Sequence, residues 1–139
     1  MEDHQQLEHR LAHIVAMLES NQHEAMPALW IEFDARTRAH LGAEERYLLP
    51  ALLRWRRRDA GAIVEEHKLI RRRLDELATA IGDRAVKVND LRRFLDELSA
   101  HGRIEDQRVY QWADEHLPPS AKPAVLANLA QAMGLPAPR

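Results

Sequence analysis

The stretch Ala39–Tyr47 reads AHLGAEERY, and the stretch Ala100–Tyr110, AHGRIEDQRVY, repeats its pattern of one histidine followed by two adjacent acids. Each stretch places a glutamate four residues after its histidine: His40 with Glu44, and His101 with Glu105. Side chains four residues apart share one face of an α-helix. The repeat therefore predicts two helices that each present a histidine and a carboxylate to a common interior.

A single histidine beside an acid precedes each copy of the pattern. His4 lies 36 residues before His40, and His67 lies 34 residues before His101. Four histidines and two carboxylates at matched spacing suit a paired metal site, because imidazole is a strong ligand and a carboxylate can bridge two cations. The candidate metal ligands are His4, His40, Glu44, His67, His101 and Glu105.

Helix-forming residues dominate the composition. The chain has 139 residues, 45% of them hydrophobic and only 5 of them glycine, and it is rich in Ala, Leu, Glu and Arg. This balance predicts an all-α protein. A chain of this length can bury its own core, so we expect a single domain at 1–139. The absence of cysteine excludes disulfides and thiolate-ligated zinc or iron–sulfur sites.

The charge balance is nearly even, with 20 basic and 22 acidic residues. It argues against nucleic acid as an obligatory partner. The basic run Arg54–Arg58 favours a solvated loop, with an anion or nucleic-acid patch as the alternative. No apolar stretch approaches the roughly 20 residues that span a bilayer, and the N-terminal residues are polar. We therefore expect a cytoplasmic protein with no membrane partner.

Hydrophobic periodicity predicts four long helices and a short one, at about 2–20, 26–53, 60–81, 90–117 and 121–133. Asp90 is the expected N-cap of the fourth helix, Pro50 is expected to kink or end the second, and Arg54–Ala60 is expected to form a loop. Short connections between long helices favour an up-down-up-down four-helix bundle, spanning about 2–117, with a short additional C-terminal helix. That last helix could dock a second copy of the chain or a protein partner.

Helical phase places the histidines on inward faces. At about 100° per residue, His4 and His67 both share the apolar stripe of their helices. Burying carboxylates and imidazoles costs several kcal/mol unless something pairs with them. A single inward histidine is usually a packed core residue, but an inward histidine on each of the four long helices favours a metal site. His9 and His13 fall on the solvent side of their helix and are expected to form a surface pair.

Other polar residues near the pattern have open or minor roles. His23 and His116 lack partner spacing, and neither receives a role. Tyr47 and Tyr110 follow the two motifs; packing is favoured for them, and a hydrogen bond to a bound ligand is the alternative. Arg71, one turn after His67, either pairs with a bridging carboxylate or extends to solvent.

Imidazole and carboxylate without thiolate suit iron or manganese, allow zinc and disfavour calcium. The order in which these histidine and carboxylate motifs follow one another along the chain resembles that of the hemerythrin family, specifically its HHE cation-binding branch. The resemblance covers about Asp3 to Leu117, and its most specific segments are DHQQL, HLGAEERYLLPAL, EEHKLI and HGRIEDQRVY. It implies a non-haem di-iron centre in a four-helix bundle.

The resemblance also implies how the ligands divide: His4 and His40 would hold one iron, His67 and His101 the other, and Glu44 and Glu105 would bridge. The oxygen-carrying members have a further histidine one turn from the helix-three histidine, but here position 71 is Arg and position 63 is Ile. Four histidines leave each iron more open, which disfavours reversible oxygen storage.

The second bridging carboxylate has two candidates. The oxygen carriers use an aspartate five residues after the histidine of helix four, and Asp106 has that spacing. Glu105 mirrors the spacing of Glu44 on helix two, and we favour it.

These observations predict a small di-iron module that binds or senses O2, NO, peroxide or iron itself. The alternative is a di-iron oxidoreductase, such as a ferroxidase or a peroxide-handling enzyme. A metal-free structural bundle is a third interpretation, and the complete His/Glu set argues against it.

Overall fold

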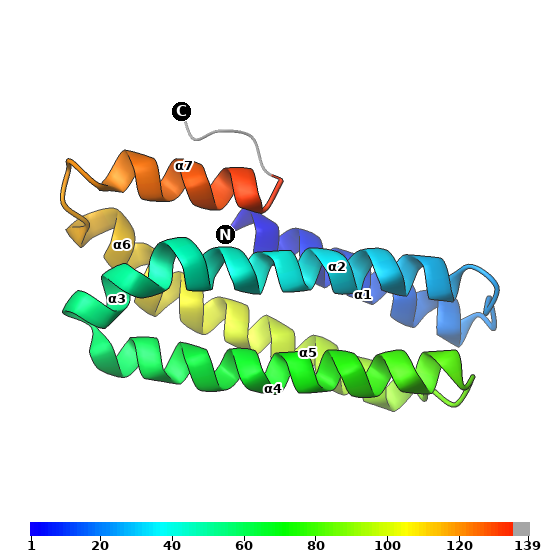
Figure 1. Ribbon diagram of the computed structural model, residues 1–139. Coiled ribbons are helices and arrows are strands. Elements are labelled where there is room, and N and C mark those ends of the chain that lie inside the picture. The colour runs from blue at the N-terminus through cyan, green and yellow to red at the C-terminus, as the bar shows by residue number, and fades with distance from the viewer. Residues whose placement is uncertain (135–139) are drawn as a thin grey trace.

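A computed structural model describes residues 1–134, and within them the chain forms helices and no β-strand (Figure 1). The α-helices are α1 (Glu2–Glu19), α2 (Met26–Ala43), α3 (Leu49–Trp55), α4 (Arg57–Gly82), α5 (Val88–Glu105), α6 (Gln111–His116) and α7 (Lys122–Ala132). Two π-helical segments, η1 (Glu44–Leu48) and η2 (Asp106–Tyr110), join α2 to α3 and α5 to α6. The single domain expected at 1–139 extends into residues 135–139, which lie outside the described residues.

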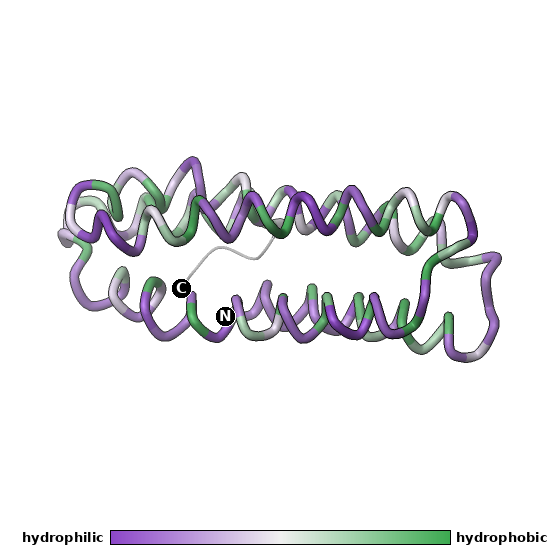
Figure 2. Tube along the Cα trace, turned by 90° about the horizontal axis from the view of Figure 1, so that it is seen from below, coloured by the Kyte–Doolittle hydropathy of each residue, from purple (hydrophilic) through white to green (hydrophobic). Residues whose placement is uncertain are grey.

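Four rods make up the bundle: α1, then α2 with η1 and α3, then α4, then α5 with η2 and α6 (Figure 1). Successive rods run in opposite directions. Hydrophobic and hydrophilic residues alternate along each rod at helical spacing (Figure 2). The predicted all-α up-down-up-down bundle with a short C-terminal helix is thereby confirmed.

Two local expectations were wrong. The loop expected at Arg54–Ala60 is a sharp corner at Arg56, because α3 continues to Trp55 and α4 begins at Arg57. Arginine is a good helix former, and Arg56 pairs with Asp59 at 2.8 Å across the first turn of α4. The basic residues of this corner are exposed.

The expected N-cap of the fourth long helix was the second wrong expectation. Lys87, not Asp90, is the N-cap of α5, and Asp90 lies in the first turn, where a carboxylate still faces the positive end of the helix dipole. Pro50, which was expected to kink or end the second helix, does not end it, because α3 continues to Trp55. It lies in the first turn of α3 directly after η1, where the shifted backbone hydrogen bonds accommodate a residue without an N–H.

Two apolar clusters fill the bundle. The first lies between α1, α2, α4 and α5, and Leu11, Phe33 and Phe94 are almost fully buried in it. The second lies toward α3 and α6 and contains Leu52 and Trp112. The six candidate ligands fall between the parts of the helices that form these clusters, so the interior changes from apolar to polar and back along the bundle.

Helix α7 completes the second cluster. It lies beside η1 and α2, at the end of the bundle that α1 does not cover (Figure 1). Leu129 and Ala130 of α7, and Met133 at its C-cap, are buried against the same chain. Docking of a partner on α7 stays a prediction. None of the described helices combines the length and apolar character needed to cross a membrane.

Candidate metal centre

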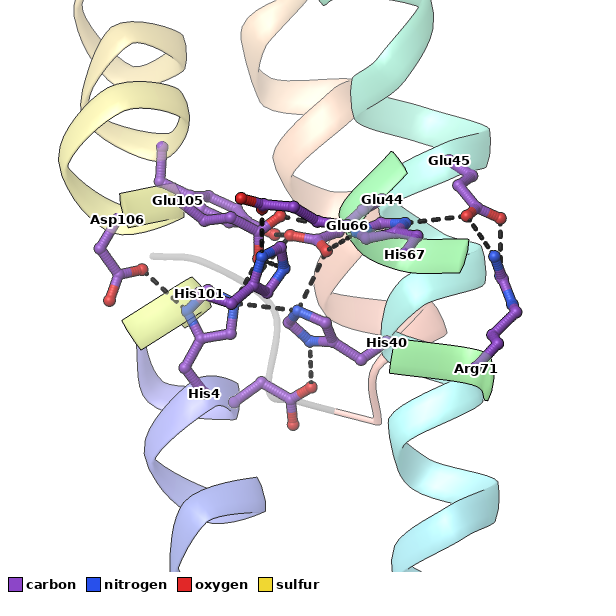
Figure 3. Close-up of polar contacts among 12 residues, drawn as sticks. His4, His40, Glu44, Glu45, Glu66, His67, Arg71, His101, Glu105 and Asp106 are labelled. Atoms are coloured by element: carbon purple, nitrogen blue, oxygen red, sulfur yellow. Dashed lines mark hydrogen bonds and ion pairs between the residues drawn. The ribbon is translucent and has the colours of Figure 1, made fainter. Parts of the chain in front are cut away.

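All four rods contribute to one buried polar layer. Its six residues are His4 on α1, His40 on α2, Glu44 at the start of η1, His67 on α4, and His101 and Glu105 on α5. Each is less than 9% exposed, and Glu44, His67 and Glu105 are at most 1% exposed. Figure 3 shows the imidazoles and the two glutamates pointing toward one another. The structure thus brings together every residue that the sequence predicted as a ligand; their metal binding stays a prediction.

The donor atoms form two groups that share both glutamates. One group is His4, His40, Glu44 and Glu105; the other is Glu44, His67, His101 and Glu105. Within each group, one donor atom per residue lies within 4.8 Å of the others. This division is the one that the resemblance implied, with two histidines on each side and two carboxylates in common.

The glutamates lie between the two histidine pairs. Oε1 of Glu44 is 3.3 Å from Nε2 of His40 and 3.2 Å from Nε2 of His67. Oε1 of Glu105 is 3.1 Å from Nε2 of His4 and 2.9 Å from Nε2 of His101. Each carboxylate therefore contacts one histidine of each pair, as a bridging ligand would.

A second set of carboxylates contacts the outer nitrogens of the same histidines (Figure 3). The Nδ1 contacts are His40 to Asp3 at 2.7 Å, His67 to Glu45 at 2.8 Å, His101 to Glu66 at 2.5 Å, and His4 to Asp106 at 3.0 Å. A carboxylate at Nδ1 fixes the ring with its proton on that nitrogen and leaves Nε2 for a metal.

These outer contacts close a ring around the bundle. Asp3 on α1 supports a histidine of α2, Glu45 in η1 supports one of α4, Glu66 on α4 supports one of α5, and Asp106 in η2 supports one of α1. Every rod thus gives a histidine to the centre and a carboxylate to the next rod. Because neighbouring residues on a helix differ by about 100°, adjacent acids such as Glu44 and Glu45 can serve these two directions.

The sequence did not assign roles to these four outer acids. The signal was present, because each of Asp3, Glu45, Glu66 and Asp106 is adjacent in sequence to a candidate ligand. Asp106, the alternative to Glu105, points to His4 and keeps 33% of its side-chain exposure.

Arg71 takes neither of the two roles considered for it. Its guanidinium makes two contacts of 2.7 Å with Glu45, an outer carboxylate and not a central one. The hydrogen bond from Arg71, working against partial burial, lowers the pKa of Glu45. Position 71 therefore supports His67 through Glu45 and adds no donor to the centre.

Tyr110 has a polar role where packing was favoured. Its hydroxyl donates a 2.7 Å hydrogen bond to Oε2 of Glu44, and its ring meets His4 edge-on at 5.7 Å. Burial and the nearby glutamate charges raise the pKa of Tyr110 well above its usual value, so the phenol stays a donor. Tyr47, in contrast, packs against the second apolar cluster.

The remaining histidines lie outside this layer. His9, His13 and His23 are exposed, and His116 stacks on the Trp112 ring at the end of α6.

The electrostatics of the layer favour cations. Burial works to lower the pKa of His40 and His67, but neighbouring carboxylates overcome it and raise both to about 10. Burial works to raise the pKa of Glu105, but the close imidazoles of His101 and His4 overcome it and hold that pKa well below its usual value. Without metal, protonated histidines therefore balance the central carboxylates.

Several buried nitrogen and oxygen atoms at the centre lie close to one another but make no hydrogen bond of acceptable geometry. They are Oε1 of Glu44, Nε2 of His67, Nε2 of His101 and both carboxylate oxygens of Glu105. Buried polar atoms left unpaired are costly, and here they converge on one place. Nitrogen and oxygen donors without sulfur in this arrangement fit a pair of iron or similar divalent ions.

Comparison with known proteins agrees with this site. The model of the hemerythrin HHE cation binding domain family matches residues 1–124, which is most of the chain. The chain therefore belongs to the hemerythrin HHE cation-binding family. No curated protein and no solved structure matched the chain.

Proposed function

We propose that this chain is a non-haem di-iron protein that binds or senses a small ligand such as O2, NO or peroxide, or iron itself. The observation that carries the proposal is the convergence of unpartnered Nε2 and carboxylate atoms between two histidine pairs. Manganese or zinc could use the same donors.

The roles follow from the contacts. His4 and His40 would hold one ion, His67 and His101 the other, and Glu44 and Glu105 would bridge them. Bound iron would supply redox change and positions for exchange of small ligands. The protein supports this centre by excluding water with apolar clusters on both sides and by fixing each imidazole through an outer carboxylate.

A di-iron oxidoreductase is the second candidate function. It is favoured by Arg71, which contacts Glu45 and leaves the His67 side of the centre without a further protein donor. An open position at a redox metal suits turnover of ferrous ion or peroxide as well as reversible binding. A metal-free structural bundle is the least supported function, because it leaves the central atoms without hydrogen bonds even when protonated histidines balance the charge of the glutamates.

Elemental analysis after anaerobic iron loading tests the proposal. We expect up to two irons per chain. Replacing His40 or His101 by Ala should lower iron content, whereas replacing His9 and His13 together should not, because those two are exposed. Absence of bound metal, or equal loss from both kinds of variant, would contradict the site.

Mixing the reduced, loaded protein with O2 separates the two functions. An absorption band that disappears under vacuum would favour reversible binding. We expect the reduced protein to oxidise irreversibly instead, because four histidines leave the irons open. Repeated consumption of added ferrous ion or peroxide would then favour the enzyme.

A further inference from the structure

A small cavity lies beside the candidate metal centre. Its volume is about 10 Å³, which is close to the space of one water molecule. Its lining residues are His4, Leu7, Thr37, His40, Leu41, Leu98 and His101. Leucine side chains offer no hydrogen bond, and the histidines are candidate ligands. Thr37 is therefore the one polar lining residue with no role in holding metal.

Thr37 is fully buried on α2, three residues before His40. Its hydroxyl donates a 2.8 Å hydrogen bond to the carbonyl oxygen of Phe33. A hydroxyl has one donor and two acceptor lone pairs. Since its proton is engaged with Phe33, Thr37 can offer the cavity an acceptor only.

Apart from Thr37 and the histidines that are candidate metal ligands, the cavity is lined by leucines, so an acceptor at Thr37 distinguishes ligands by whether they carry a hydrogen. We propose that Thr37 is a specificity-determining residue: its hydroxyl oxygen accepts a hydrogen bond from the O–H of a peroxide ligand at the metal pair, such as hydrogen peroxide. Azide and NO carry no hydrogen and gain nothing from it. This inference rests on the proposed function and assigns it a preferred class of ligand.

The expected size of the effect follows from the surroundings. A hydrogen bond in a dry interior is stronger than one in water. Its loss should therefore weaken binding by roughly tenfold, which is the upper end of the net range for one hydrogen bond. Azide affinity, which should not change, is the reference against which this loss of peroxide affinity is measured.

The chain offers a matched set of variants. Thr37→Val keeps the branched shape and removes the oxygen, and Thr37→Ser keeps the oxygen. Thr79 on α4 makes the same bond to the carbonyl four residues earlier, at 3.2 Å to Asp75, but on an exposed surface. Thr79→Val therefore controls for the loss of a hydrogen bond from a threonine hydroxyl to the helix backbone at a position away from the centre.

The experiment uses the full chain loaded with iron and oxidised. Iron content is measured first, then azide affinity by absorbance titration, and then the half-saturating concentration of hydrogen peroxide from the initial absorbance change after stopped-flow mixing. Thr37→Val should need about tenfold more peroxide, with azide affinity within about twofold of wild type. Thr37→Ser and Thr79→Val should match wild type for both ligands.

Two results would overturn the inference: peroxide binding by Thr37→Val that equals wild type, or an equal loss of azide and peroxide binding, which would indicate distortion of the centre. If Thr37→Val does not fold, the inference is tested with Thr37→Ser, which must then retain the wild-type ratio of peroxide to azide affinity. Failure of the wild-type chain to bind iron would instead contradict the proposed function.

Discussion

The Asp3 carboxylate on α1 lies 2.7 Å from Nδ1 of His40 on α2, and both side chains are buried. The contact joins two helices and sets the orientation of a candidate ligand at the same time. Outer carboxylates of this kind hold the tautomer and ring angle of metal-bound histidines. Arg36 approaches the other Asp3 oxygen at 3.6 Å, so the acid is held from the outside as well.

Replacing Asp3 by Asn should lower iron affinity by about 10- to 100-fold, the usual cost of losing an outer partner of a metal ligand. Glu2→Gln is the control, because Glu2 is the adjacent acid in the first turn of α1 but is exposed. Competition with a chelator of known affinity gives the measurement. Equal affinity in both variants would show that Asp3 does not position His40.

Tyr110→Phe should weaken iron binding by about tenfold, because a hydrogen bond to a charged carboxylate contributes more than one between neutral groups. The lost bond is the 2.7 Å contact to Glu44. Tyr47→Phe should leave iron affinity unchanged, since the Tyr47 ring packs in the second apolar cluster. Isothermal titration of both variants checks the difference, and a larger loss from Tyr47→Phe would contradict it.

Helical periodicity was sufficient to predict the bundle and the inward face of its six central residues. A rotation of about 100° per residue places His40 with Glu44, and His101 with Glu105, on shared faces without knowledge of neighbouring helices. The outer contacts could not be found this way. Which acid meets which Nδ1 depends on the rotation and height of two rods relative to each other, and a single helix does not contain that information.

The role of Tyr110 was hidden by the π-helical segment η2. In a regular α-helix, a residue five positions after Glu105 faces about 140° away from it. Hydrogen bonds between residues five apart in η2 return Tyr110 toward the interior, where it meets Glu44. The expected loop at Arg54–Ala60 failed for a related reason, because charged helix formers can continue a helix up to a corner.

Gly102→Ala should disturb the His4 side of the centre. A methyl group at position 102 would lie 3.3 Å from Cγ of His4, so the imidazole must shift to admit it. At Gly42 the same methyl group meets nothing within 4 Å. Gly42→Ala should therefore stabilise its helix by about 0.5–1 kcal/mol, whereas Gly102→Ala should gain less and bind less iron. Thermal unfolding and iron content are the measurements, and equal behaviour would contradict close packing at His4.

The stability of the metal-free protein should fall as pH rises. His40 and His67 have pKa values of about 10 in the folded protein, against 6.5 for an unperturbed histidine. A raised pKa stabilises the fold fully below 6.5, and this contribution is lost as pH rises toward about 10. Chelated protein should therefore unfold at lower temperature at pH 9 than at pH 6.5, while Glu105, whose pKa is lowered, stays ionised across this range.

Iron should reverse this dependence, because metal ligation requires neutral imidazole and competes with protons. Metal bound only to the folded state also adds stability by mass action. The difference in Tm between loaded and chelated protein should thus widen from pH 6.5 to pH 9, as protons leave His40 and His67 and the central glutamates lose their counter-charge. Differential scanning calorimetry of both forms across this range measures the gap. A gap that narrows with rising pH would mean that these histidines do not exchange protons for metal.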